Sequence, residues 1–258
     1  MNAKAAELGL VNTHFETPHG LDSDKHYTTA YELALLSNYA LNNKIFAQIV
    51  GTKEYTITIN NSPKQLSNTN ELLGNFAGIY GIKTGFTNGA NRCLVTACKR
   101  NDIDIICVVL GADTKKFRTK DSVKLINYIF DNFEIVNLED VINKKFETWK
   151  KENLEKITIN KAYTQDINLK IEDISIKSIP VHKDMVDNIE INIECPMYFE
   201  APISSNLNVG SVDISISNFC NFKYYIYNVN EIKRKNSFNY FFELLKNYIY
   251  ITNSFVFL

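Results

Sequence analysis

The heptapeptide Gly81-Ile-Lys-Thr-Gly-Phe-Thr87 places an amine, a hydroxyl and a position without a side chain at the end of a strand-like run. Lys83 can stabilise a negative charge and assist proton transfer. The Thr84 hydroxyl can hydrogen-bond an anionic oxygen, and Gly85 leaves room for a second backbone beside the strand. The triplet therefore suits binding of an anionic, peptide-like group. Taken alone, however, the triplet Lys-Thr-Gly consists of common residues, and an exposed strand end explains it better than a binding site does.

The remaining side chains of chemical interest predict no metal site and no cofactor. His14 and His19 lack nearby acidic partners with metal-ligand spacing, and we interpret the four histidines as residues that pack within loops. The cysteines include no Cys-x-x-Cys pair, and most lie in apolar runs, so we expect small buried hydrophobic residues. The cysteines are Cys93, Cys98, Cys107, Cys195 and Cys220, and the other two histidines are His26 and His182.

The overall charge argues against a nucleic-acid partner. The chain of 258 residues has a net charge of −1 and a pI of about 6.4, whereas binding of phosphate backbones requires a basic face. With 45% hydrophobic and 22% charged residues, the composition is that of a soluble globular protein. The length permits one large domain or two smaller ones.

Three strand-like runs predict the sheet that positions Lys83: Gly78–Phe86, Arg92–Lys99 and Ile103–Gly111. The last two runs are almost continuously apolar, which is typical of strands covered on both faces, so we expect helices to pack on this sheet. Helices are predicted at 28–42, with a capping box of Thr29 and Glu32, at 44–50 and at 121–133. We expect a strand at 54–60 and a loop at 61–78.

The pattern changes near residue 135. From 134 to 230 the chain shows short alternating stretches and no convincing helix, which favours a small antiparallel β domain. The charged segment 143–153 is predicted to be an exposed connection. The strands are expected at 156–160, 167–171, 174–179, 189–194 and 211–217.

The last part of the chain predicts an amphipathic helix. After the basic cluster Lys233-Arg-Lys235, six apolar residues fall on one helical face, whereas Glu243 and Lys246 interrupt the run too early for a membrane span. Such a helix can lie in a membrane surface, and docking on its own domain or on a partner is the alternative. The six residues are Phe238, Phe241, Phe242, Leu245, Tyr248 and Ile249.

Segments on both sides of Lys-Thr-Gly carry further matches. The triplet is one of three signatures of serine enzymes that act on penicillin, beside Ser-x-x-Lys and Ser-Asp-Asn. The stretches 14–21, 27–33 and 68–73 resemble segments that D-alanyl-D-alanine carboxypeptidases carry after the second and before the third motif, and 93–95, 108–112 and Arg118 match downstream. The chain thus resembles the low-molecular-mass penicillin-binding proteins.

The resemblance implies a fold and three regions. The fold class is α+β, with residues 1–134 as the C-terminal part of a transpeptidase-like catalytic domain, an antiparallel sheet with helices. Residues 135–230 would form the small β-rich domain of the family, and residues 231–258 its amphipathic membrane anchor. The complete protein would act at the extracytoplasmic face of the membrane, in the cell envelope.

The resemblance also implies a substrate and residue roles. The substrate would be a peptidoglycan stem peptide ending in D-Ala-D-Ala, cleaved through an acyl-enzyme, and β-lactams would bind the complete enzyme. Lys83 would stand beside the nucleophile, Thr84 would bond the terminal carboxylate, and Gly85 would admit the substrate backbone. The N–H of Phe86 would donate to the oxyanion, and the fork of Arg118 would hold the carboxylate. Arg118 alone could equally be a solvated surface arginine.

The chain departs from the family at the nucleophile. Catalysis needs a serine activated by a lysine three residues later, and no serine here has one. Thr96-Ala-Cys-Lys99 has the spacing but lies in an apolar strand, and Ser204-Ser-Asn206 lies in the β region. In the family both motifs precede the segment at which this chain begins. We therefore expect a C-terminal part without a signal peptide, inactive alone, with exposed apolar edges.

Two function classes remain open from the sequence. The first is a carboxypeptidase of the cell envelope, for which Lys83, Thr84, Gly85, Phe86 and Arg118 are the site residues. The second is a non-catalytic module that binds or positions something in the envelope through the β region and the tail. A third class, a zinc peptidase, is set aside because this sequence lacks the ligands of a zinc site.

Overall fold

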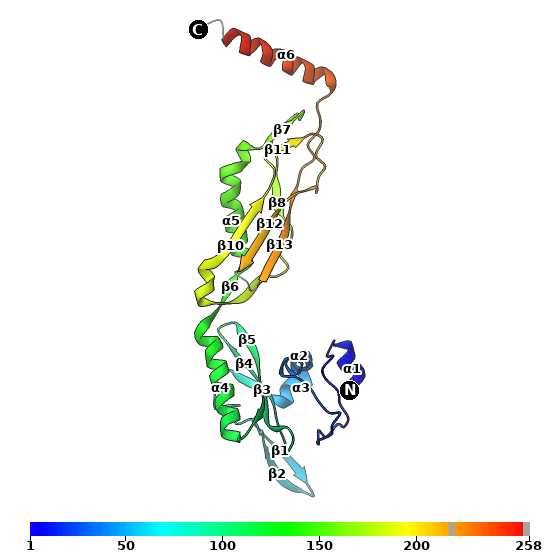
Figure 1. Cartoon of the computed structure of the whole chain (residues 1–258), viewed down its shortest axis with the longest axis vertical. Coiled ribbons are helices and arrows are strands. Elements are labelled where there is room, and N and C mark those ends of the chain that lie inside the picture. The colour runs from blue at the N-terminus through cyan, green and yellow to red at the C-terminus, as the bar shows by residue number, and fades with distance from the viewer. Residues whose placement is uncertain (217–219, 255–258) are drawn as a thin grey trace. The chain divides into compact units, whose positions relative to one another are not determined.

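The computed structural model describes residues 1–216 and 220–254. The chain separates into two compact units, Met1–Glu134 and Ile135–Leu258, here called unit 1 and unit 2 (Figure 1). Both combine helices with antiparallel sheets, and the predicted α+β class is confirmed.

The centre of unit 1 is a three-stranded antiparallel sheet in the order β3-β4-β5. Its strands are β3 (Ile79–Thr87), β4 (Asn91–Arg100) and β5 (Ile103–Ala112), each within a residue or so of its predicted bounds. Lys83 lies opposite Val95, and Val95 opposite Val108. Because directly opposed residues of an antiparallel pair point to the same side, these three residues share one face of the sheet.

Helix α4 (Lys115–Asn132) covers the other face (Figure 1). It starts six residues before the predicted helix, because Thr114 caps it by accepting a hydrogen bond from the amide of Phe117. Burial of apolar surface between α4 and the strands stabilises this half of unit 1. The buried cluster consists of Leu72, Leu73, Ile79, Leu94, Cys98, Cys107, Val109 and Ile126.

Helices α2 (Ala30–Leu41) and α3 (Lys44–Val50) lie on the Lys83 face (Figure 1). A small cluster of Val50, Ile82 and Ala97 is buried there. Only half of the predicted capping box forms. The amide of Glu32 donates to Thr29, but the Glu32 carboxylate accepts from Asn12 and Thr13 instead. Glu32 therefore ties the segment after α1 (Asn2–Glu7) to α2.

The prediction of a loop over 61–78 was wrong in its first part. β1 (Glu54–Ile59) pairs with β2 (Ser62–Ser67) through a turn in which Asn60 and Asn61 have positive φ. Two such asparagines are typical of a tight hairpin turn. The strand was missed because every residue of β2 is exposed, so it shows no apolar alternation.

In unit 2, the prediction of an exposed connection at 143–153 was also wrong. Helix α5 (Leu138–Asn153) begins at the cap Asn137, which accepts from the amide of Asp140. Leu138, Ile142 and Phe146 are buried at four-residue spacing, and Trp149 stacks on Phe146 with 6.1 Å between ring centroids. The apolar stripe of α5 is narrow and lies among many charged residues, so the helical periodicity of the sequence was too weak to predict the helix.

The sheets of unit 2 are small. The largest has the order β10-β12-β13-β8 and is antiparallel throughout, whereas β7 and β11 pair in parallel, against expectation. β6 (Phe133–Asn137), at the unit boundary, pairs with β9. The strand predicted at 174–179 begins later, at Ser178, and residue 217 lies outside the described residues. The strands are β7 (Thr158–Asn160), β8 (Leu169–Ile171), β9 (Ser178–His182), β10 (Ile189–Glu194), β11 (Tyr198–Glu200), β12 (Asn208–Ile216) and β13 (Cys220–Asn228).

Helix α6 (Ser237–Ser254) ends the described chain. Its polar side is attached to unit 2, since Asn239 donates to the hydroxyl of Tyr163 and the hydroxyl of Tyr240 donates to Asn160. Phe238 and Phe242, on the predicted apolar face, are exposed. No helix among the described residues is long and apolar enough to cross a membrane.

Candidate active site

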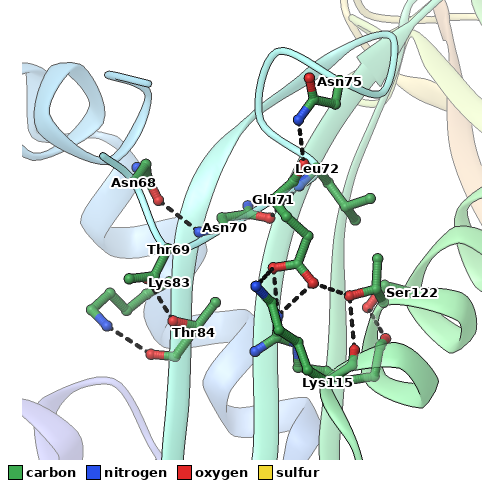
Figure 2. Close-up of polar contacts among 12 residues, drawn as sticks. Asn68, Thr69, Asn70, Glu71, Leu72, Asn75, Lys83, Thr84, Lys115 and Ser122 are labelled. Atoms are coloured by element: carbon green, nitrogen blue, oxygen red, sulfur yellow. Dashed lines mark hydrogen bonds and ion pairs between the residues drawn. The ribbon is translucent and has the colours of Figure 1, made fainter. Parts of the chain in front are cut away.

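Lys83 and Thr84 lie in the middle of β3, beside the segment Asn68–Glu71 (Figure 2). The Lys83 ammonium donates to the carbonyl of Thr84 at 2.7 Å. The hydroxyls of Thr84 and Thr69 are 2.6 Å apart, and the side-chain Nδ2 of buried Asn70 donates to the carbonyl of Gly81 at 2.9 Å. The segment thus binds along β3 through polar contacts and leaves the Lys83 side chain exposed.

Gly85 is a glycine that the fold itself does not require. A Cβ there would meet only the Cβ of Cys93, at 3.6 Å, an ordinary van der Waals distance, and its φ is not in the left-handed region. At Gly81, by contrast, a Cβ would come within 3.2 Å of Val50. Glycine at 81 is therefore explained by packing, whereas glycine at 85 leaves open space beside the strand, as a substrate backbone would need.

The end of β3 is held in place by residues that the sequence analysis did not identify. The guanidinium of Arg92 lies 3.5 Å from the ring centroid of Phe86, its partner across the hairpin. Asp22 accepts a hydrogen bond from the amide of Gly89, in the turn between the strands, at 3.1 Å. The hairpin register could have indicated Arg92, because aromatic and guanidinium groups at opposed positions stack. No sequence signal links Asp22 to this turn.

Arg118 is not a solvated surface arginine. Its side chain is 4% exposed, and its guanidinium donates to both carboxylate oxygens of Glu71, at 2.6 and 2.8 Å. Thr119 also donates to Glu71. Figure 2 shows Glu71 reaching from the segment Asn68–Glu71 toward α4. This segment therefore connects the β3 residues with Arg118, although no direct contact joins Arg118 to Lys83 or Thr84 among the described interactions.

Hydrogen bonds favour the charged form of the Glu71 carboxylate. Burial opposes ionisation, but the hydrogen bonds from Thr119 and its own backbone amide, and then the Arg118 guanidinium, outweigh that effect and hold the pKa of Glu71 below its ordinary value. The Arg118 fork is thus already occupied by a carboxylate, that of the protein itself. Its Nε atom is buried without a hydrogen-bond partner.

The other sequence candidates lie outside this cluster. His14, His19 and His26 bond to loop backbone, as expected for residues that pack within loops. Cys98 and Cys107 are buried, whereas the remaining three cysteines are half-buried. Within residues 1–216 and 220–254, no group of three or more His, Cys, Asp or Glu side chains could hold a metal ion.

Comparison with known sequences points to one family. Residues 1–114 match the profile of the D-alanyl-D-alanine carboxypeptidase family, Peptidase_S11. The chain is 38% identical over 135 residues to D-alanyl-D-alanine carboxypeptidase DacF of Bacillus subtilis, covering 52% of this chain and 35% of DacF. It is 31% identical over 216 residues to D-alanyl-D-alanine carboxypeptidase DacD of Escherichia coli, covering 83% of this chain and 52% of DacD.

Comparison with solved structures finds similar proteins as well, and the similarity of fold includes unit 2. Penicillin binding protein 5 from Haemophilus influenzae superposes with a TM-score of 0.60 at 24% identity, covering 90% of this chain and 64% of that one. D-alanyl-D-alanine carboxypeptidase DacD from Francisella tularensis superposes with a TM-score of 0.58 at 22% identity, covering 91% and 67%. These likenesses support the α+β fold over both units.

The matched portions are partial. The chain spans about a third to a half of the length of these curated relatives. The family profile lies entirely within unit 1, and it includes the Lys83-Thr-Gly85 strand and the segment Asn68–Glu71. Residues 1–114 of this chain therefore resemble the D-alanyl-D-alanine carboxypeptidase family.

Proposed function

We propose that unit 1 forms the Lys-Thr-Gly side of the active site of a serine-type D-Ala-D-Ala carboxypeptidase, which removes the terminal D-Ala of peptidoglycan stem peptides through an acyl-enzyme. The observation that carries the proposal is the open strand end at Gly85. There the fold tolerates a side chain but has none, beside an exposed Lys83 and a half-buried Thr84.

In this proposal the substrate lies along the end of β3. The Lys83 ammonium favours anionic species at the reacting centre, and the Thr84 hydroxyl bonds the terminal carboxylate. The N–H of Phe86 donates to the developing oxyanion, and the stack of Arg92 on Phe86 holds that end of the strand in place. Arg118 assists in holding the terminal carboxylate of the substrate. Because the guanidinium already binds Glu71, the substrate carboxylate has to bind beside Glu71 or displace it.

The chain as it stands lacks the group that would be acylated. No serine in the sequence has a lysine three residues later, and an activated serine needs such a base. We therefore expect no penicilloyl adduct on this chain alone. Intact-mass spectrometry after incubation with benzylpenicillin tests this, and a stoichiometric adduct would show that another nucleophile serves.

Substrate recognition can be tested separately from acylation. An acylated D-Ala-D-Ala peptide should shift the NMR signals of the Gly85 and Phe86 amides, because it lies beside them, and the L-Ala-L-Ala peptide is the matched control. Lys83→Ala should weaken the shifts without unfolding unit 1, since Lys83 is exposed. Equal shifts with both peptides would contradict the proposal.

The location proposed for the protein is the cell envelope, with α6 in the membrane surface. The polar side of α6 faces unit 2, while Phe238, Phe242 and Tyr248 are 69%, 54% and 68% exposed. Exposed aromatic residues beyond a basic cluster suit the headgroup region of a bilayer. Sedimentation with anionic lipid vesicles should deplete the wild-type chain but not the double variant Phe238→Ser/Phe242→Ser; binding unchanged by the variant would exclude this role.

A further inference from the structure

The chain has four arginines, and three of them have a polar partner in the protein. Arg92 is the exception. Within residues 1–216 and 220–254, its guanidinium has no hydrogen bond or ion pair and rests on the ring of Phe86, 3.5 Å from the ring centroid. Arg92 thus keeps its hydrogen-bond donors for another group. The other three pairs are Arg118 with Glu71, Arg234 with Glu200, and the Nε of Arg100 with the carbonyl of Ala77.

The stack on Phe86 orients these donors. A distance of 3.5 Å is van der Waals contact, so the guanidinium lies against the face of the ring and directs its N–H groups outward in its own plane. Phe86 is 53% exposed and Arg92 is half-buried, so a solute can reach the pair. A guanidinium held in one orientation is preorganised for a carboxylate, which accepts two parallel hydrogen bonds from it.

Arg92 and Thr84 lie on the same side of the sheet. Phe86 is opposite Arg92, and Thr84, two positions before Phe86, is opposite buried Leu94 on the α4 side. In the described part of unit 1, β3 is an edge strand that pairs in its sheet only with β4. An extended peptide can pair with the free edge of such a strand and present its side chains to both faces.

The proposed function sets the direction of that peptide. With the terminal carboxylate at Thr84 and the scissile carbonyl at the N–H of Phe86, the peptide runs antiparallel to β3. Its preceding residues therefore continue past Phe86. At about 3.3 Å per residue, the residue before D-Ala-D-Ala lies level with Phe86 and Thr87, next to the guanidinium of Arg92.

We propose that Arg92, held on Phe86, is an anion subsite that selects peptides with a side-chain carboxylate on the residue before D-Ala-D-Ala. The inference rests on the proposed function for the direction of the peptide. The unpaired guanidinium and its place beside an edge strand rest on the geometry alone. Asp22, the acidic residue at this hairpin, binds the amide of Gly89 rather than the guanidinium, which leaves Arg92 available to an acidic ligand.

The experiment compares the binding of acylated tripeptides to this chain. The peptides are acetyl-Glu-D-Ala-D-Ala, its Gln counterpart, and the same two with L-Ala-L-Ala. Dissociation constants come from the NMR shifts of the Phe86 amide, and the Nε–H signal of Arg92 reports on the subsite directly. We expect the Glu peptide to bind about three- to fivefold more tightly than the Gln peptide, as for a partly exposed ion pair. Added salt should reduce this ratio.

Variants separate the charge from the ring that holds it. Arg92→Gln should bring the Glu-to-Gln ratio to about one, and Arg92→Lys should retain part of it, because lysine keeps the charge but not the fork. Phe86→Leu keeps the backbone N–H but removes the ring, so the ratio should fall although Arg92 is present. Lys99→Gln removes an exposed cation near the other end of β4. It is the matched control and should leave the ratio unchanged.

The outcomes separate the subsite from the proposed function. A preference for D-Ala-D-Ala over L-Ala-L-Ala, with a Glu-to-Gln ratio that Arg92→Gln does not change, overturns the subsite and leaves the proposed function standing. A preference for Glu that depends on Arg92 but is equal for both configurations supports the subsite and contradicts the proposed function.

Two further results would overturn the inference. If amidation of the terminal carboxylate, and not the exchange of Glu for Gln, removes the effect of Arg92→Gln, the guanidinium holds the terminal carboxylate instead. If none of the peptides binds, both the subsite and the proposed function are wrong for this chain. Circular dichroism of each variant confirms that a lost preference does not come from unfolding.

Discussion

Unit 2 gathers twenty buried hydrophobic residues into one continuous cluster, whereas unit 1, of similar length, has eight on the α4 face of its sheet and three on the Lys83 face. These three counts refer to the part of the chain that the structure describes. In unit 2, α5 lies along the sheet and buries Leu138, Ile142 and Phe146, with Ile142 fully covered. In unit 1, the apolar helix α2 buries only polar residues.

The difference teaches that the two units reach stability by different means. Unit 2 relies on burial of apolar surface, the dominant favourable contribution in folding. Unit 1 has less of it, and polar ties replace part of the missing core. Glu32 holds Asn12 and Thr13, while Glu71 holds Arg118.

Truncation of a core side chain should affect unit 2 more than an equivalent change on the open face of unit 1. Ile226 is fully buried, so Ile226→Ala should lower the free energy of unfolding of unit 2 by about 2–5 kcal/mol. Leu35→Ala, at a partly exposed position, should cost less than about 1 kcal/mol. The only tryptophan, Trp149, packs on the unit 2 cluster, so urea unfolding followed by its fluorescence reports on unit 2. Similar losses would mean that the Lys83 face is already a complete core.

Removal of Glu71 should destabilise unit 1 through the charge that it leaves behind. Glu71→Ala strands the buried Arg118 guanidinium, and we expect a loss of about 2–3 kcal/mol. Glu147→Ala in unit 2 breaks an exposed pair with Lys150 and should cost less than about 1 kcal/mol. Hydrogen exchange of amides in α4 and β5 measures the first effect. If Glu71→Ala leaves that exchange unchanged, the polar tie does not stabilise unit 1.

Acid should weaken unit 1 through the same carboxylates. The pKa values of Glu71 and Glu32 lie below the ordinary 4.5. A group with a lowered pKa in the folded state contributes stability above the unfolded pKa and loses it as the pH falls through the folded pKa. Protection of α4 amides should therefore fall as the pH drops below the ordinary 4.5, and it should vary less in Glu71→Gln. An identical decline in the variant would assign the acid response to other groups.

The smallest effect is expected at Gly85. Gly85→Ala should change the stability of unit 1 by no more than about 0.5 kcal/mol, because the new methyl group meets only Cys93 at an ordinary distance. Gly81→Ala, four residues earlier on the same strand, should be clearly destabilising, since its Cβ presses on Val50. Thermal unfolding of the two variants makes the comparison. A large loss at Gly85 would give that glycine a structural reason and remove the main support for the proposed substrate strand.

Much of unit 1 followed from local pattern. Strands β3 to β5 were predicted because apolar runs separated by turn residues indicate strands directly, and α3 was predicted to the residue. Two elements were missed for opposite reasons. β2 is exposed along its whole length, so nothing alternates. α5 carries one buried residue per turn among charges, so its periodicity was too weak to recognise.

The site residues divide in the same way. Lys83, Thr84 and Gly85 were identified because they are adjacent in the sequence and form a signature with a chemical meaning. The contacts of Glu71 with Arg118, of Asp22 with Gly89 and of Arg92 with Phe86 join residues by spatial proximity. The first two pairs are 47 and 67 residues apart in the chain, with several helices and strands between them, and no sequence signal links them.

What the sequence by itself determined about this protein is therefore local: the strand that carries Lys-Thr-Gly, the helices beside it and the family that residues 1–114 match. Adjacent residues and short periods suffice for these because propensity, turns and amphipathicity act over a few positions. Only the tertiary structure decided that Arg118 is buried against Glu71 and that the Lys83 face is left partly open. Burial and pairing depend on which distant segments meet, and a single sequence does not record that.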